Sequence, residues 1–152
     1  MLLLFMGPSC SGKTSVAKKL AERTGCSIWS GKDYFRLAKN QDEAWKIFLS
    51  MLRDASNEAV LDAKSIIYLI GNPTELRNDL LTIPNLKRIK FNADISVLKN
   101  RFAERIGQKP LSLPLDKMIE RQQKAFQTIS ADKEFDTTNE EVDSIIDNIL
   151  TL

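Results

Sequence analysis

The sequence of 152 residues contains no histidine and only two cysteines, Cys10 and Cys26. Without histidine, the chain cannot build a Ser-His-Asp triad, an imidazole general base or a zinc site with histidine ligands. A general base must therefore be a carboxylate, Lys, Tyr or Cys side chain. The two cysteines have no motif spacing, and so few thiols favour a reducing, cytoplasmic environment over a disulfide framework.

A strong excess of charge and long apolar runs are also missing. Lys and Arg number 22 against 20 Asp and Glu, and a net charge of +2 is too small to indicate nucleic acid as a partner. No stretch approaches the roughly 18 apolar residues of a membrane span, so no membrane partner is expected. The apolar opening, residues 1–6, has no basic leader and runs directly into Gly7 and Pro8, so we interpret it as a buried strand.

Apolar runs of strand length alternate with segments of helical periodicity along the chain. Predicted strands cover residues 2–6, 27–30, 65–71, 86–91 and 134–136. Predicted helices cover residues 14–23, 34–60 with a break at 40–42, 74–81, 94–106, 115–129 and 140–150. Strands separated by helices of this length imply βαβ units. We therefore predict one α/β domain over residues 1–152, with three αβα layers around a five-stranded parallel sheet.

Residues 7–14, Gly-Pro-Ser-Cys-Ser-Gly-Lys-Thr, match the Walker A pattern G-x-x-x-x-G-K-[ST] in full. In such a P-loop, backbone N–H groups and the start of the following helix attract phosphate. Lys13 would reach the β- and γ-phosphates, and the Thr14 hydroxyl would bind Mg²⁺. The predicted nucleotide-binding residues are Gly7, Ser9, Cys10, Ser11, Gly12, Lys13, Thr14 and Ser15. A chance match in a surface turn is the alternative, but the strand before the motif and the amphipathic helix after it favour nucleotide binding.

With this motif, the chain resembles the small P-loop kinases, the superfamily of nucleoside monophosphate kinases, shikimate kinase and gluconate kinase. The resemblance extends over nearly the whole chain, although the motifs outside the P-loop are individually weak. It implies the P-loop NTPase fold with a short helical lid at about residues 101–121. It also implies ATP and Mg²⁺ as cofactors and a small molecule as the phosphoryl acceptor.

The segment that follows the second predicted strand contains two candidate acceptor-binding residues, Asp33 and Arg36. It is similar to the Gly-Asp-x-x-Arg segment of adenylate kinases and to the Asp after strand two in shikimate and gluconate kinases. Lys32 separates Gly31 from Asp33, so the match is imperfect. The resemblance implies that Asp33 orients the acceptor and that Arg36 binds its phosphate. Helix capping is the alternative role for Asp33, because Asp is common before a helix.

Arg101 and Arg105 lie four residues apart on one predicted helix, at a place that resembles the start of the lid in these kinases. Two arginines on one helical face are suited to stabilise charge on the transferred phosphoryl group. Arg121, on the next predicted helix, resembles a further active-site arginine of the nucleoside monophosphate kinases. A solvated basic face is the alternative for all three. Residues 135–139 resemble the segment that passes the adenine ring, and the alternative there is capping of the last helix by Thr138 or Asn139.

One feature of the P-loop kinases is missing. The predicted strand 65–71 ends in Gly71-Asn72 without the usual aspartate, and Asp62 lies before that strand. We expect an ATP-dependent phosphotransferase whose acceptor is a nucleotide or a hydroxyl metabolite. A nucleotide-dependent regulator that hydrolyses ATP slowly is the alternative, and an inactive relative that keeps only the fold is a third.

Overall fold

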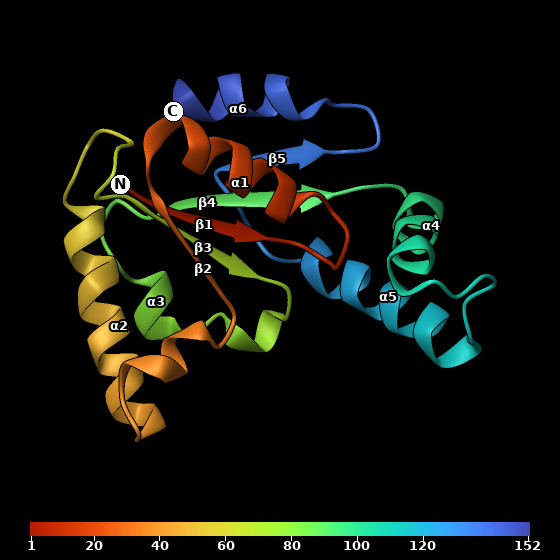
Figure 1. Ribbon diagram of the computed structural model, residues 1–152, viewed down its shortest axis with the longest axis horizontal. Helices are drawn as coiled ribbons and strands as arrows, with labels where there is room; N and C mark the ends of the chain where they lie inside the picture. Colours follow the sequence, from red (N-terminus) through yellow and green to blue (C-terminus); the bar gives the residue numbers. More distant parts are fainter.

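The computed structural model describes all 152 residues and contains one parallel sheet in the order β2-β3-β1-β4-β5 (Figure 1). The strands are β1 (Leu2–Met6), β2 (Ser27–Ser30), β3 (Ile66–Ile70), β4 (Lys87–Asn92) and β5 (Lys133–Asp136). All neighbouring pairs are parallel. The prediction of a five-stranded parallel sheet between helical layers is therefore confirmed, and so is the P-loop NTPase-like fold.

The helices follow the predicted order, with differences at their ends. They are α1 (Lys13–Thr24), α2 (Gln41–Ser56), α3 (Asn78–Leu81), α4 (Ile95–Ile106), α5 (Leu113–Gln127) and α6 (Val142–Leu150), with 3₁₀ turns η1 (Asp33–Leu37) and η2 (Pro73–Glu75). The predicted helix 74–81 is divided between η2 and α3. Helix α5 begins two residues earlier than predicted because Pro114 lies in its first turn, where a missing N–H costs no hydrogen bond.

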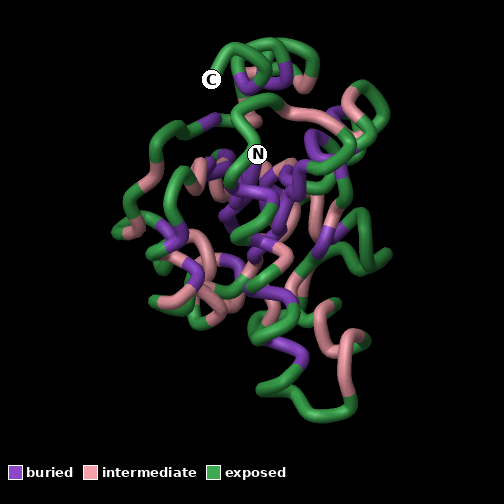
Figure 2. The backbone as a smooth tube through the Cα atoms, turned by 90° about the vertical axis from the view of Figure 1, so that its left-hand side faces the viewer, coloured by how far each residue is buried: buried purple, intermediate pink, exposed green.

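The two faces of the sheet are covered by different helices. On one face, Leu3 and Phe5 of β1 belong to a buried core with residues of α1 and α6. On the other face, Leu2 and Leu4 belong to a core with residues of α2, α3 and the end of α5. Every residue of β1 is buried, as expected for the central strand of a parallel sheet. Figure 2 shows these buried segments gathered at the centre of the molecule.

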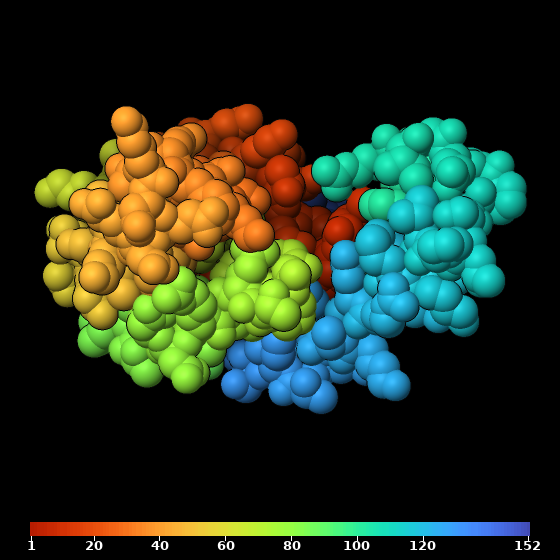
Figure 3. Space-filling view, turned by 90° about the horizontal axis from the view of Figure 1, so that it is seen from below, coloured from red at the N-terminus to blue at the C-terminus, as the bar shows by residue number.

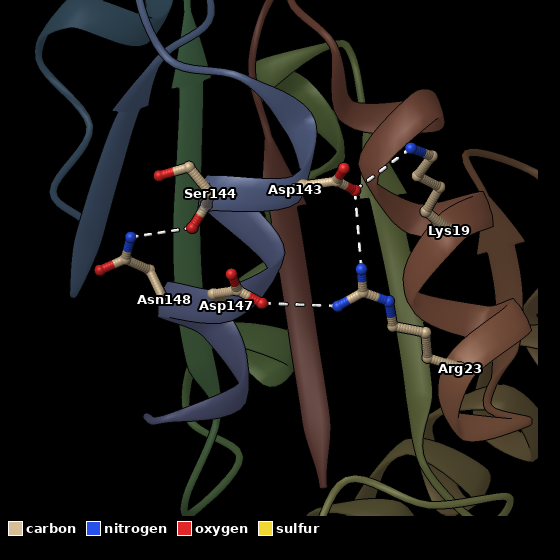
Figure 4. Close-up of polar contacts among 6 residues, drawn as sticks. All are labelled: Lys19, Arg23, Asp143, Ser144, Asp147 and Asn148. Atoms are coloured by element: carbon tan, nitrogen blue, oxygen red, sulfur yellow. Dashed lines mark hydrogen bonds and ion pairs between the residues drawn. The ribbon is translucent and has the colours of Figure 1, made fainter.

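Helix α6 is also joined to α1 by ion pairs at the surface (Figure 4). Lys19 lies 3.2 Å from Asp143, and Arg23 lies 3.6 Å from Asp143 and 3.5 Å from Asp147. All four side chains are largely exposed, so each pair contributes well under about 1 kcal/mol to stability. The buried core that α1 and α6 share, more than these pairs, keeps α6 beside α1.

The loops that follow the strands meet at one edge of the sheet. The chain leaves β1 toward β2 and leaves the neighbouring β4 toward β5, which makes the carboxyl ends of β1 and β4 a switch point of the kind where ligands bind. In Figure 3 the red residues of the amino-terminal segment line the floor of a hollow between the orange and yellow-green segments and the cyan segment that includes the end of α4. None of the helices is both long and apolar enough to cross a membrane.

Candidate active site

The P-loop between β1 and α1 needs glycine at two positions for steric reasons. Gly7 has φ of 154°, and a Cβ there would collide with the main-chain oxygen of Phe91. Gly12 has φ of 99°, and a Cβ there would lie 2.9 Å from the Thr137 methyl carbon. Cys10 also has a left-handed conformation, with φ of 65°. The loop therefore folds back tightly over the carboxyl ends of β1 and β4 before α1 begins.

Lys13 is folded onto the P-loop itself. Its Nζ donates hydrogen bonds to the main-chain oxygens of Gly7 and Pro8, the latter at 2.8 Å, and to Ser11 Oγ at 3.4 Å. The side chain is only 8% exposed. Burial lowers the pKa of Lys13 to about 8, and the positive charge of Arg105 contributes to the lowering. A polyanion beside Lys13 would oppose both effects, because it would stabilise the charged amine.

A cavity of about 620 Å³ opens beside the P-loop. It is lined by residues 10–16, by Arg101 and Arg105 of α4, by Thr137 and by residues 140–142. Helix α1 directs its amino-terminal end, with the partial positive charge of the helix dipole, at this space. The predicted residues Cys10 to Ser15 thus line one cavity together with both lid arginines, whereas Gly7 and Ser9 are not among the lining residues.

A second and larger cavity, of about 790 Å³, lies between α5 and the ends of β4 and β5. No P-loop residue lines it. Its acidic lining includes Asp94, Glu134 and Asp136, and its one cation, Lys90, is paired with Glu134 at 2.8 Å. Such a lining repels phosphate, so the smaller cavity beside the P-loop is the candidate nucleotide site.

The two lid arginines have different surroundings. Arg101 donates three hydrogen bonds of 3.0 Å, to the main-chain oxygen of Cys10 and to the hydroxyl and main-chain oxygen of Thr137. Arg105 lies one turn further along α4, is exposed, and has no hydrogen bond or ion pair with another residue. Arg101 therefore holds the P-loop against the segment after β5, and Arg105 is the cation that remains available at the cavity.

Helix α5 contacts the P-loop through Gln122. Its Oε1 accepts a hydrogen bond of 3.1 Å from the Ser9 N–H, across 113 positions of sequence. The predicted residue, Arg121, is exposed and neither lines the cavity nor has a hydrogen bond or ion pair. Consecutive residues on a helix are about 100° apart around its axis, so Gln122 and Arg121 cannot both face the loop. The sequence prediction chose Arg121 for its positive charge. The orientation of α5 instead places Gln122 on the side of the helix that faces the P-loop.

The predicted acceptor residues follow β2 and are not among the residues that line the P-loop cavity. Asp33 is exposed, and its Oδ2 accepts a hydrogen bond of 2.9 Å from the Ser30 N–H. Its carboxylate thus stabilises the turn out of β2, and Lys32 rather than Asp33 occupies the N-cap position of η1. Arg36 lies with its guanidinium carbon 4.2 Å from the centre of the Trp29 ring, in a cation–π contact.

The segment after β5 is fixed by threonines. The Thr137 hydroxyl donates to the main-chain oxygen of Ser11 at 2.8 Å, and the Thr138 hydroxyl accepts from the Asp94 N–H at 2.7 Å. The expectation that Thr138 or Asn139 caps the last helix is wrong, because the N-cap residue of α6 is Glu141. The segment instead links the P-loop to the start of α4.

The end of β3 has no aspartate, as the sequence indicates, but a glutamate follows a few residues later. Glu75 ends η2, is half-buried, and directs its Oε2 toward Gly31 at the end of β2, within 3.5 Å of where a Cβ would stand. Burial raises the pKa of Glu75, and the positive charge of Lys32 opposes the rise. Nothing in the sequence distinguished this carboxylate from other surface acids.

The residues around the P-loop cavity fit a nucleotide with its magnesium ion, but not a metal held by protein alone. No group of three or more Cys, Asp or Glu side chains is arranged to hold a metal ion. Thr14, exposed at the cavity, would be the one protein ligand of the site. This suits Mg²⁺, which keeps several water ligands and takes others from nucleotide phosphates.

Comparison with solved structures identifies proteins of the same fold. The chain matches an uncharacterized protein from Eubacterium ventriosum, with 24% identity and a TM-score of 0.67, over 99% of this chain and 96% of that one. It matches the YorR protein of Bacillus subtilis in complex with phosphorylated GDP, with 24% identity and a TM-score of 0.67, over 99% and 94% of the two chains.

It also matches shikimate kinase from Acinetobacter baumannii in complex with shikimate, with 14% identity and a TM-score of 0.64, over 99% and 90%. No protein-family model and no curated protein matches the sequence. At these identities the likeness establishes a fold, and it is the fold of the small P-loop kinases.

Proposed function

We propose that the protein is an ATP-dependent phosphotransferase that moves the γ-phosphoryl group of ATP to a small-molecule acceptor. The observation that carries the proposal is the meeting of Lys13, Arg105 and the amino-terminal end of α1 at one cavity of about 620 Å³. Phosphoryl transfer depends on positioning and on cations that oppose the charge of the transferred group, so this arrangement is sufficient without histidine.

The residues around the cavity divide into two roles in this proposal. Lys13 exchanges its contacts with the loop oxygens for the β- and γ-phosphates, Thr14 binds the magnesium ion, and Arg105 stabilises charge in the transition state. Arg101 is a positioning residue that acts through the P-loop. When bound, Mg²⁺ would neutralise phosphate charge.

The acceptor is proposed to bind in the hollow between the ends of β2 and β3 and the lid, where Asp33 would orient it. Asp33 has one oxygen engaged with Ser30 and leaves Oδ1 free for an acceptor hydroxyl. Arg121 has no part in this proposal, because it is not among the residues that line the P-loop cavity. Arg36 is held on Trp29 and remains a candidate for contact with the acceptor.

The donor is proposed to be ATP, since the sequence has no Asn-Lys-x-Asp segment for guanine recognition. Because YorR was solved in complex with phosphorylated GDP, GTP is the alternative donor to compare with ATP in the assay. A slow ATPase that acts as a nucleotide-dependent regulator is the second candidate. The absence of an aspartate after β3, at Gly71-Asn72, favours it.

A coupled assay of ADP release with Mg²⁺ and ATP separates the two candidates. Shikimate, gluconate, nucleosides and nucleoside monophosphates are added in turn, and GTP replaces ATP in a parallel series. A kinase releases ADP in step with formation of a phosphorylated acceptor, whereas a regulator shows the same slow release with every addition. Lys13→Ala should abolish transfer and weaken ATP binding. Equal ATP affinity of Lys13→Ala and wild type in calorimetry would sink the assignment of the P-loop.

A further inference from the structure

Glu75 is placed at the carboxyl ends of β2 and β3. Its Oε2 lies beside Gly31, whose N–H donates to the oxygen of Leu69 at 2.9 Å and whose oxygen accepts from the Tyr68 hydroxyl at 2.7 Å. The Glu75 charge contributes, after burial, to a raised pKa of Tyr68. These contacts place the carboxylate over the point where β2 and β3 both end.

The Glu75 carboxylate has no partner in the protein. None of the hydrogen bonds or ion pairs of the structure involves its oxygens, although the side chain is half-buried. Two acids nearby are engaged: Asp33 accepts from Ser30, and Asp79 accepts from the Trp45 ring N–H at 2.7 Å. No buried side-chain oxygen of the structure lacks a hydrogen-bond partner, so the Glu75 oxygens are open to solvent and accessible to a ligand.

The same edge of the sheet adjoins the P-loop. Strand β3 lies between β2 and β1, and the Gly7 N–H donates to the oxygen of Ile70 at 3.3 Å. The start of the P-loop and the end of β3 are therefore neighbours, and Glu75 follows that end by five residues. In Figure 3 the yellow-green segment after β3 borders the hollow whose floor is formed by the red amino-terminal segment.

We propose that Glu75 binds the reacting hydroxyl group of the acceptor and removes its proton, so that the acceptor is an alcohol and not a nucleoside monophosphate. This inference rests on the proposed kinase function. As the acceptor oxygen forms its bond to the γ-phosphorus, the bond from phosphorus to the β,γ-bridging oxygen breaks, and ADP leaves with that oxygen. The hydroxyl proton passes to the Glu75 carboxylate and from there to water.

The chemistry of the two acceptor classes favours an alcohol. A phosphate acceptor offers oxygens that are already ionised near neutral pH, so it needs no base, and a carboxylate beside it would repel it. An alcohol must lose its proton during transfer and gains from a hydrogen-bond acceptor at the nucleophile. With histidine absent, a carboxylate is one of the side chains that can act as the base.

The charges around Glu75 are consistent with this role. Burial raises the pKa of Glu75, which makes its carboxylate a stronger base, while the positive charge of Lys32 opposes the rise. Tyr68 and Asp33 face the same region, and so does Arg77, whose guanidinium carbon lies 4.4 Å from the centre of the Trp45 ring. Protonation of Glu75 at low pH should therefore stop transfer.

The test uses Glu75→Gln, which keeps the size of the side chain, and Glu75→Asp, which keeps its charge. Glu58→Gln is the matched control, because Glu58 is exposed and lies beside Met1, at the opposite edge of the sheet. Alcohols (shikimate, gluconate, adenosine, thymidine) and nucleoside monophosphates (AMP, CMP, UMP, GMP) are compared as acceptors. For each variant we would measure kcat, the KM for ATP, the pH profile of kcat and, by calorimetry, ATP affinity.

We expect wild type to phosphorylate one of the alcohols and none of the monophosphates. Glu75→Gln should lower kcat at least ~10²-fold with unchanged ATP affinity and should lose the fall of kcat at low pH. Glu75→Asp should keep part of the activity, and Glu58→Gln should match wild type. Transfer to a monophosphate, or full activity of Glu75→Gln, overturns this inference and leaves the kinase proposal intact. If wild type binds ATP but phosphorylates nothing in either set, the kinase proposal fails and this inference falls with it.

Discussion

Arg101 donates hydrogen bonds to both the hydroxyl and the main-chain oxygen of Thr137, each at 3.0 Å. The same guanidinium binds the main-chain oxygen of Cys10, and the Thr137 hydroxyl binds that of Ser11. Two P-loop carbonyls are thus fixed by a side chain of α4 and by the segment after β5. The shape of the nucleotide site depends on this network, so the site is already formed before a nucleotide binds.

Arg101→Lys tests whether the network is structural. Lysine keeps the positive charge but has no planar fork to bind several oxygens, so at least one partly buried acceptor loses its partner. We expect the free energy of unfolding to fall by about 1–2 kcal/mol and ATP affinity to fall with it. Urea denaturation and calorimetry measure the two quantities. Unchanged stability with reduced kcat alone would instead assign Arg101 to the transition state.

Arg105→Ala should give the opposite pattern. The side chain is exposed and has no partner in the protein, so its loss should leave stability within about 0.5 kcal/mol of wild type. If Arg105 opposes charge in the transition state, kcat should fall by roughly 10²-fold with little change in the KM for ATP. Lys117→Ala, which also removes an exposed cation of the lid region, is the control. Equal kcat for the two variants would make Arg105 part of a solvated face.

The pKa of Lys13 makes stability depend on pH. Burial lowers this pKa from 10.5 to about 8, so the folded protein binds fewer protons than the unfolded chain between those pH values. The free energy of unfolding of wild type should therefore rise relative to that of Lys13→Met from about pH 8 to 10.5, by about 3 kcal/mol. Below pH 8 Lys13 is charged in the folded protein, and the full cost of burying that charge lowers the free energy of unfolding. Urea denaturation across this range measures the difference, and parallel curves for both proteins would contradict it.

Gly7→Ala should be strongly destabilising, whereas Gly71→Ala should be tolerated. The new methyl group would collide with the Phe91 oxygen at position 7, where φ is 154°, but nothing lies within 4 Å at position 71. We expect a loss of about 2 kcal/mol or more for Gly7→Ala and less than about 0.5 kcal/mol for Gly71→Ala. Thermal or urea unfolding of both proteins checks the contrast. Similar losses would mean that the P-loop relaxes around the added methyl group.

The sequence predicts those parts of the protein that are determined by local pattern. The Walker A motif places Lys13 and Thr14, and the alternation of strands and helices predicts the sheet. It does not predict which residue of α5 meets the P-loop, since the choice between Arg121 and Gln122 depends on the angle at which the helix docks. It also does not reveal Glu75, because the burial of this carboxylate arises from the pairing of β2 with β3, segments about 40 residues apart.

Asp33→Asn separates the role of Asp33 in the fold from its role toward the acceptor. The asparagine side chain keeps an oxygen that can accept from the Ser30 N–H, so the stability loss should be well under about 1 kcal/mol. Asp33→Ala removes that acceptor and should cost about 1 kcal/mol. If the free Oδ1 orients the acceptor, Asp33→Asn should raise the KM for the acceptor by about tenfold, through loss of a charge-assisted hydrogen bond.

The kinetic pattern distinguishes Asp33 from Glu75. Asp33→Asn should leave the KM for ATP unchanged and should keep the fall of kcat at low pH, because the proposed proton acceptor, Glu75, is still present. Glu75→Gln should lose that fall and reduce kcat instead of raising the KM for the acceptor. Unfolding of Asp33→Asn, or loss of its ATP affinity, would make Asp33 a structural residue only. If no acceptor is phosphorylated and neither substitution changes basal ATP hydrolysis, the slow ATPase is favoured. Water is then the only nucleophile, and neither carboxylate positions it.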